Sequence, residues 1–247
     1  MASLRYVERV RALLDEVFDQ EGAAIAAAID LITAANLEKR SVFIFGASHA
    51  GILSEEMYYR AGGLITINPI FGRELMLDRN PVSFTSQMER LPGYGTLLGQ
   101  DTPFQSGDVL ILHSVSGRNT VTIDLALYAK SLGVHIIALT NVSYSASTES
   151  RHPSGKRLFE IADVVIDNHG DIGDASVQIP GVPQAVGATS TVIGATILNA
   201  IIVEVVANLV AAGVENPPIF YSANLDGGDA LNKQIVAQYR DVIHYDF

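Results

Sequence analysis

The chain has 247 residues, of which 48% are hydrophobic, so it is long enough to bury a substantial core. Its 16 lysines and arginines against 27 aspartates and glutamates give a net charge of −11, which argues against nonspecific nucleic-acid binding. The absence of cysteine excludes disulfides, thiolate catalysis and cysteine-ligated metal sites. Because no linker-like stretch divides it, the chain is expected to form a single domain over residues 1–247. This would comprise a helical extension (1–40), an α/β core (41–212) and a C-terminal extension (213–247).

The first part of the chain has helical periodicity, which predicts two helices over residues 3–35. Its charged N-terminus lacks the apolar segment of a secretory signal, so a cytoplasmic protein is expected. From Ser41 the pattern changes to alternating strands and helices. The spacing predicts a strand over 42–45, a helix from about 50 to 61 and a strand over 64–70.

Residues 71–107 are irregular and interrupted by proline and glycine. A loop of that length in a compact domain is usually functional or carries short helices of its own, and residues 80–94, which include Glu89, are a candidate lid. The next predicted elements are a strand over 109–113, a helix over 119–132 and a strand over 134–140. Repeated units of this kind predict a parallel sheet.

An apolar run over residues 192–213 approaches the length of a membrane span. It contains Asn199, Glu204 and Asn208 and has no flanking cations, which favours a buried helix or a helix at a subunit interface. A charged side chain at Glu204 then needs a partner or water. The other elements expected after residue 140 are a polar loop (143–152), a short helix (155–161), a strand (163–166) and a C-terminal helix from about residue 230.

Three turns rich in hydroxyl groups follow strands or precede helices, at residues 46–49, 114–120 and 189–191. Turns at the carboxyl ends of neighbouring parallel strands can converge on one ligand. The N–H groups at a helix start favour an anion there. Each turn alone is also explained by helix capping, which serine and threonine perform in most proteins. The three together predict a phosphate-binding site.

The strand, the SxSGxxT-like turn, the helix and the IALT strand of residues 108–140 resemble the core of the sugar isomerase (SIS) domain family. The segments FGAS at 45–48 and GATST at 187–191 look like the family's other two ligand-binding elements. The resemblance covers about residues 5–212. It implies an α/β fold with a five-stranded parallel sheet flanked by helices, a flavodoxin-like three-layer sandwich assembled as a homodimer or homotetramer.

The same resemblance implies that a phosphorylated sugar binds to the three turns without a metal or an organic cofactor. Arg118 would pair with the phosphate through its planar guanidinium, although exposure to solvent explains this residue as well. The substrate-binding candidates are Ser48, Ser114, Ser116, Gly117, Arg118, Asn119, Thr120, Thr189, Ser190 and Thr191.

Aldose–ketose isomerisation through an enediol needs a base that moves a proton between adjacent carbons. In related isomerase and etherase members a catalytic glutamate lies ten residues after the serine of the first turn, and that count from Ser48 reaches Tyr58. Glu55 lies three residues earlier, on the same face of the predicted helix, and is the candidate base. His49, beside the same turn, is the candidate acid for opening the sugar ring.

An aldose–ketose phosphosugar isomerase is therefore the expected function. Two alternatives stay open: a phosphosugar sensor without catalysis, suggested by Tyr58, and an etherase-type lyase acting on an amino-sugar phosphate. The residues before the first strand are too few and too acidic for a DNA-binding module, so nucleic acid is not an expected partner. A membrane is not expected either, because polar residues interrupt the apolar run over 192–213. A dinucleotide-binding oxidoreductase is set aside because no complete G-x-G-x-x-G pattern follows Phe45.

Overall fold

The computed structural model describes residues 1–246, and a five-stranded parallel sheet lies at its centre. The strands are β1 (Val42–Gly46), β2 (Ile67–Pro69), β3 (Val109–His113), β4 (His135–Thr140) and β5 (Val164–Asp167). Their spatial order is β2-β1-β3-β4-β5, so the chain winds outward from β1 in both directions. Such a sheet leaves a crevice between the carboxyl ends of the two strands where the winding reverses, here β1 and β3.

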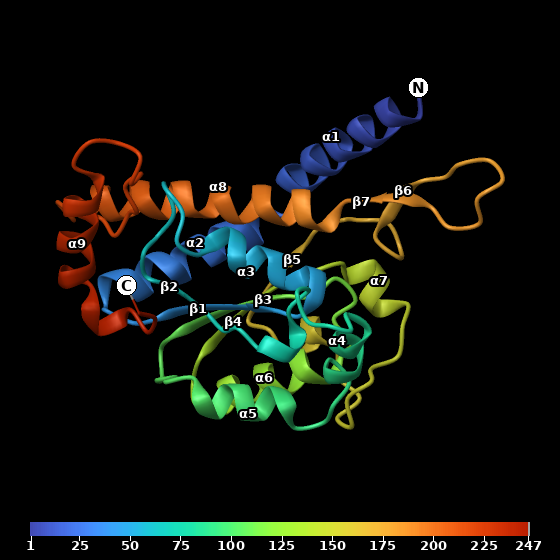
Figure 1. Cartoon of the computed structure of the whole chain (residues 1–247), viewed down its shortest axis with the longest axis horizontal. Helices are drawn as coiled ribbons and strands as arrows, with labels where there is room; N and C mark the ends of the chain where they lie inside the picture. Colours follow the sequence, from blue (N-terminus) through green and yellow to red (C-terminus); the bar gives the residue numbers. More distant parts are fainter. Residues whose placement is uncertain (247) are drawn as a thin grey trace.

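Helices cover both faces of the sheet. They are α1 (Ala2–Gln20), α2 (Gly22–Leu37), α3 (Ile52–Met57), α4 (Ser83–Met88), α5 (Tyr94–Asp101), α6 (Thr120–Ser131), α7 (Val142–Ala146), α8 (Ser190–Ala211) and α9 (Gly228–Gln238). Short 3₁₀ turns are η1 (Ser48–Gly51), η2 (Arg73–Leu75), η3 (Leu158–Glu160) and η4 (Arg240–Val242). Helices α2, α3 and α8 lie on one face and α5 and α6 on the other (Figure 1), which confirms the predicted three-layer arrangement.

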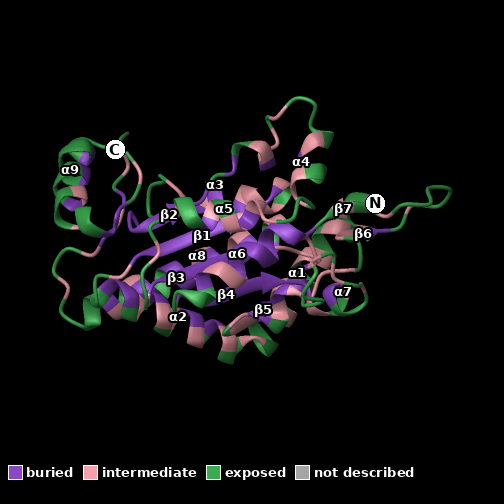
Figure 2. Cartoon of the chain, turned by 90° about the horizontal axis from the view of Figure 1, so that it is seen from below, coloured by how far each residue is buried: buried purple, intermediate pink, exposed green. Residues whose placement is uncertain are grey.

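The side chains of β1 explain why its sequence is apolar throughout. Val42 and Ile44 belong to the core under α2 and α8, whereas Phe43 and Phe45 belong to the core under α6. Successive side chains of a strand point to opposite faces, and here both faces are covered by helices. The strands are accordingly buried along most of their length (Figure 2).

Helix α8 packs one side against α2 and α3 and leaves the other side exposed. Ile197 and Ile201 are buried in the core, whereas Val203 is 69% exposed. Within residues 1–246 it is the one helix whose length and hydropathy would allow a membrane span, and 44% of its most apolar window is buried. Glu204, expected to need a partner inside an apolar helix, instead lies on the exposed side.

The second βα unit is shorter than predicted. Helix α3 ends at Met57, because Tyr58 is extended (ψ 137°) and Tyr59 takes a left-handed conformation with φ 48°. Strand β2 spans three residues instead of 64–70, because Leu64 pairs with Ile219 in the C-terminal segment. The sequence pattern could not reveal this competition between two partners for the same backbone.

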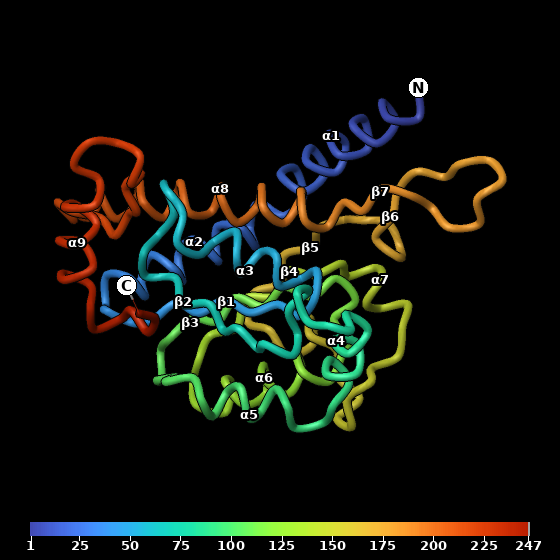
Figure 3. Tube along the Cα trace, viewed as in Figure 1, coloured from blue at the N-terminus to red at the C-terminus, as the bar shows by residue number. Residues whose placement is uncertain are grey.

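A two-stranded hairpin of β6 (Ala175–Val177) and β7 (Val186–Ala188) was not predicted, and residues 143–152, expected to be a loop, contain α7. The hairpin projects from the body beside α1 (Figure 3). The Tyr6 hydroxyl donates to the Ala188 carbonyl at 2.7 Å, and Arg9 pairs with Asp171 at 2.8 Å. Helix α1 is therefore fixed by contacts more than 160 residues away in the chain.

The C-terminal segment covers the edge strand β2. Asn68, only 2% exposed, donates to the carbonyl of Val242 at 2.9 Å and accepts from the N–H of His244 at 2.7 Å. The Tyr245 hydroxyl donates to the Ile65 carbonyl at 2.7 Å. An edge strand that is covered in this way is no longer free to pair with another chain.

Candidate anion-binding site

The loops that follow β1 and β3 start side by side, because Gly46 and His113 are register partners in the parallel ladder. The β1 loop turns tightly into η1, so a Cβ on Gly46 would lie 2.3 Å from the carbonyl oxygen of Ala50. Ser48, the first residue of η1, has φ 52°. This strained turn directs the half-buried Ser48 toward the crevice between the two strands.

The β3 loop turns at Gly117, which has φ 56° and whose carbonyl accepts the N–H of Leu158 at 2.8 Å. Asn119 then precedes α6 as its N-cap residue with an extended backbone. Its side chain makes no capping hydrogen bond, so the amide group can reach another partner. Ser114 and Ser116 are half-buried in the same loop, and Thr120 is buried with its hydroxyl donating to the Arg151 carbonyl at 3.3 Å.

The two loops meet at one carboxylate, that of the half-buried Glu89. Ser48 Oγ donates to one of its oxygens and Asn119 Nδ2 to the other. The main-chain carbonyl of Glu89 also accepts the N–H of Val121, in the first turn of α6, at 3.1 Å. Two of the sequence-predicted binding residues therefore do converge, and they converge on an oxyanion. Sequence reasoning placed Glu89 only in a candidate lid and gave it no contacts.

Arg151 lies within electrostatic range of this carboxylate and of two further arginines, Arg118 and Arg90. Arg151 Nη1 donates to Asn119 Oδ1 at 2.7 Å, and burial, followed by the positive charges of Arg118 and Arg90, lowers the pKa of the Arg151 guanidinium. The Nε atom of Arg118 is buried without a hydrogen-bond partner within residues 1–246. Three guanidinium groups and one carboxylate give this part of a strongly anionic protein a local surplus of positive charge.

A buried hydrogen bond between His152 and Asp124 fixes the loops around these arginines. His152 Nε2 lies 2.9 Å from Asp124 Oδ1, with side-chain exposures of 12% and 9%. The other oxygen of Asp124 accepts the N–H of Gly93 at 2.7 Å. Helix α6 thereby holds the loop that carries Arg151 on one side and the end of the lid segment on the other.

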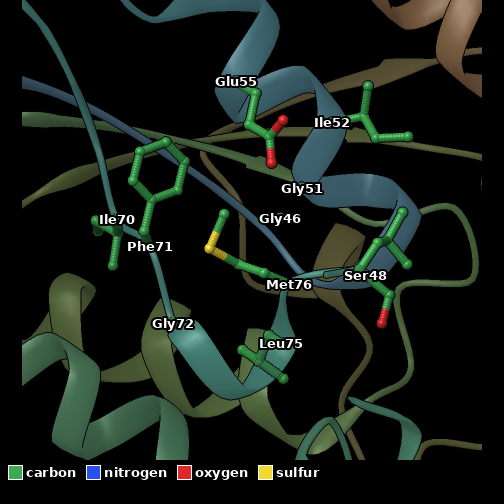
Figure 4. Close-up of a pocket in the computed structure, with 11 residues that line it drawn as sticks. Gly46, Ser48, Gly51, Ile52, Glu55, Ile70, Phe71, Gly72, Leu75 and Met76 are labelled. Carbon is green, nitrogen blue, oxygen red and sulfur yellow. The ribbon is translucent and has the colours of Figure 1, made fainter. Parts of the chain in front are cut away.

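Ser48 also lines a small pocket (Figure 4), and the volume of this pocket, about 20 Å³, is too small for a sugar. Figure 4 shows the Glu55 carboxylate pointing toward the pocket from α3, as expected for a candidate base. His49, the candidate acid, is exposed and is not part of the wall. Besides Ser48 and Glu55, the wall includes Gly46, Gly51, Phe71 and Met76.

Tyr58 does not occupy the helical position assumed for it. It follows the end of α3, and its ring contacts Tyr245 and Phe71 with centroid distances of 5.0 and 5.7 Å. Burial among these rings raises the pKa of the Tyr58 hydroxyl. The expectation that Glu55 and Tyr58 share a helix face was therefore wrong, because the helix ends between them, although Glu55 itself still reaches the pocket.

At the third turn, the carboxylate of Asp174 caps the start of α8, and the N-cap residue Thr189 makes no side-chain capping bond. Ser190 Oγ donates to Asp174 Oδ2 at 2.6 Å, and the Ser190 N–H donates to Oδ1 at 2.8 Å. Thr189 is buried, its N–H also bonds to Asp174, and Thr191 is half-buried. Thr189 and Ser190 thus donate to Asp174, and their hydroxyl groups cap no helix N–H, whereas the first two turns meet at Glu89. Among residues 1–246, no group of three or more histidine, aspartate or glutamate side chains is placed to hold a metal ion.

A doubly wound parallel sheet with an oxyanion position at its crevice defines a ligand-binding α/β domain. The profile of the SIS domain matches residues 5–141, and the chain belongs to the SIS domain family. The family and fold predicted from the sequence are thereby confirmed. A UPF0309 protein of Shouchella clausii is 49% identical over 241 residues, which cover 98% of each chain.

Two solved structures share the fold at low sequence identity. The phosphoheptose isomerase of Neisseria gonorrhoeae matches with a TM-score of 0.56 and 12% identity, over 82% of this chain and 96% of that one. The NanR protein of Vibrio vulnificus, complexed with ManNAc-6P, matches with a TM-score of 0.53 and 11% identity, over 99% of this chain and 71% of that one. At these identities the likeness establishes the fold and leaves the activity to be argued from the site.

Proposed function

We propose that this protein binds a phosphorylated sugar at the carboxyl ends of β1 and β3 and isomerises it between its aldose and ketose forms. The observation that carries the proposal is the convergence of Ser48 and Asn119 on the two oxygens of one carboxylate. These donors come from different loops and meet at a position built for an oxyanion. Arg118 and Arg151 supply positive charge beside it.

In this proposal the phosphate lies at the start of α6. A phosphate monoester carries about −1.5 to −2 charges at neutral pH, which the surplus of guanidinium groups around Asn119 balances. The likeness to NanR, whose structure holds ManNAc-6P, supports a sugar phosphate as the ligand. The other proposed binding residues of the two loops and of the third turn are Ser114, Ser116, Gly117, Thr120, Thr189, Ser190 and Thr191.

Glu55 is proposed as the base. Its carboxylate takes a proton from the carbon next to the carbonyl, which leaves an enediolate. A proton then passes from the neighbouring hydroxyl to the former carbonyl oxygen, and Glu55 returns its proton to the former carbonyl carbon. His49 is the proposed proton donor for ring opening. The fold shared with a phosphoheptose isomerase and the position of Glu55 in the pocket wall support this chemistry. Neither step requires a metal or an organic cofactor.

The test begins with a thermal-shift screen of aldose, ketose and amino-sugar phosphates. Compounds that bind are then incubated with enzyme in D₂O, and deuterium at the carbon next to the carbonyl is measured by mass spectrometry. Ser116→Ala should weaken binding, whereas Glu55→Gln should abolish exchange and leave binding intact. Glu56→Gln is the matched control, because Glu56 is the adjacent carboxylate and bonds to Asn199 and Arg60. Normal turnover by Glu55→Gln would refute the assignment of the base.

A second candidate is a sensor that binds the sugar phosphate without converting it. Tyr58, which replaces the glutamate of related enzymes and packs among aromatic rings, favours this reading. Binding without deuterium incorporation for every compound would identify a sensor. Loss of a substituent from an amino-sugar phosphate would instead identify a lyase, which begins with the same proton abstraction.

We further propose that the protein assembles as a homodimer or homotetramer through the exposed side of α8. Val192, Val203 and Val210 are 38–69% exposed on this helix, and Leu4 and Phe18 are 50% and 44% exposed on α1. Light scattering after size exclusion should show that Val203→Lys lowers the mass. Leu225→Lys, which changes an equally exposed side chain of the C-terminal segment, is the control. An unchanged mass for Val203→Lys would refute this interface.

A further inference from the structure

We propose that Glu89 is a built-in anion that occupies the phosphate subsite of the empty protein and leaves it when the ligand binds. The inference rests on the proposed function, because it assumes that the ligand is a phosphorylated sugar. The lid segment (residues 80–94) closes the empty site by placing a carboxylate where the phosphate of the ligand binds, so the ligand must displace this carboxylate.

The first argument is the set of donors that Glu89 uses. Its side chain accepts from Ser48 Oγ and Asn119 Nδ2, and its carbonyl accepts from the Val121 N–H in the first turn of α6. A carboxylate can only accept hydrogen bonds, as can a phosphate dianion. Glu89 therefore accepts hydrogen bonds from two side chains and from one N–H at the start of a helix. Donors of these types also hold phosphate groups at helix starts.

The second argument is charge. If a phosphate dianion bound to the same donors, it would lie next to the Glu89 carboxylate, and like charges at that distance repel each other strongly. The arginines Arg90, Arg118 and Arg151 around the site favour the species with the larger negative charge. The dianion therefore displaces the carboxylate instead of sharing the donors with it.

The third argument is the attachment of Glu89 to the pocket wall. Glu89 directly follows α4, and α4 packs against η2, the turn that contributes Leu75 to the wall of the small pocket. A pocket of about 20 Å³ must enlarge before a sugar fits beside Glu55. Withdrawal of Glu89 with its segment would free the anion donors and enlarge the pocket in one movement. Gly93, with φ 83°, lies at the end of this segment and is anchored to Asp124.

The alternative is that Glu89 stays in place and binds a sugar hydroxyl. The two roles predict opposite effects of its removal on phosphate affinity. A competitor lowers the apparent affinity by the fraction of molecules in which it occupies the site, whereas a binding group raises the affinity.

The experiment titrates inorganic phosphate into the unchanged protein and into Glu89→Gln and Glu89→Ala, with affinity measured by calorimetry at constant ionic strength. Both variants should bind phosphate at least about tenfold more tightly than the unchanged protein, which is the factor that one charge-assisted hydrogen bond supplies. Asp78→Asn is the control, because it removes one charge from an exposed position just before the lid segment (residues 80–94) and should leave the affinity unchanged. Thermal melting of each variant verifies that it folds.

Hydrogen exchange provides a second readout that does not depend on a variant. Saturating phosphate should accelerate amide exchange over residues 83–90 of the unchanged protein, because the segment loses its contacts with Ser48 and Asn119. If the unchanged protein binds phosphate while both Glu89 variants bind it no more tightly, the inference is overturned and the proposed function stands. If none of the proteins binds phosphate or any sugar phosphate, the proposed function fails and this inference fails with it.

Discussion

Replacement of Asp124 by alanine should destabilise the protein strongly, although the residue lies on the first half of a regular helix. Its side chain is 9% exposed and accepts two hydrogen bonds, from His152 Nε2 at 2.9 Å and from the Gly93 N–H at 2.7 Å. Both link α6 to loops that lie more than 25 residues away in the chain. The effect is therefore tertiary and does not arise from helix propensity.

The magnitude follows from these two bonds. A hydrogen bond to a charged group contributes about 1.5–3 kcal/mol, and two such bonds are lost here, because His152 and the Gly93 N–H stay buried without a partner. Asp124→Ala should therefore lower the free energy of unfolding by about 3–5 kcal/mol and the melting temperature by on the order of 10 °C. Asp124→Asn retains an acceptor for Gly93 and should lose about 1–2 kcal/mol.

Urea unfolding followed by circular dichroism measures this loss. Glu74→Ala is the control, because Glu74 pairs with Arg79 at side-chain exposures of 41% and 36%, where an ion pair contributes less than about 1 kcal/mol. If Asp124→Ala costs no more than Glu74→Ala, the pair with His152 does not stabilise the fold and the reasoning is wrong.

Gly117→Ala should lower the free energy of unfolding by about 1–2 kcal/mol, because Gly117 has a left-handed φ of 56°, and should also weaken ligand binding. Thermal melting measures the loss. Gly155→Ala is the control, because Gly155 has a φ of 73° and no neighbouring atoms, so the difference between the variants isolates the contact of the new Cβ with side chains around Gly117. Asn68→Ala should cost about 2–4 kcal/mol and expose the C-terminal segment to limited proteolysis, and resistance equal to that of the unchanged protein would contradict the role of Asn68. Burial lowers the pKa of His113 below its ordinary 6.5, so the unfolded chain takes up this proton at the higher pH. Its contribution to stability is complete above pH 6.5 and is lost as the pH falls toward the folded pKa, so urea unfolding at pH 7.5 and 5.5 should show a smaller decline for His113→Gln.

The amino-acid pattern predicts the central sheet well, because buried parallel strands must be apolar on both faces. The runs at 42–45, 109–113 and 134–140 stand out for this reason, and each matches a strand within one residue at either end. The pattern is least informative where two segments compete for one backbone. Leu64 belongs by composition to the second strand, yet it pairs with Ile219, which lies 155 residues further along the chain.

The sequence by itself determined the family, the layered α/β fold and the two turns at Ser48 and Asn119, because glycines and hydroxyl groups after strands leave a local signature. Only the tertiary structure decided what these turns contact. Glu89 lies 41 residues from Ser48 and 30 from Asn119, in a segment without periodicity, so its place between them depends on the path of a loop. Likewise, the end of α3 before Tyr58 depends on the strained conformation of Tyr59 and on packing against Tyr245 and Phe71, which no local pattern encodes.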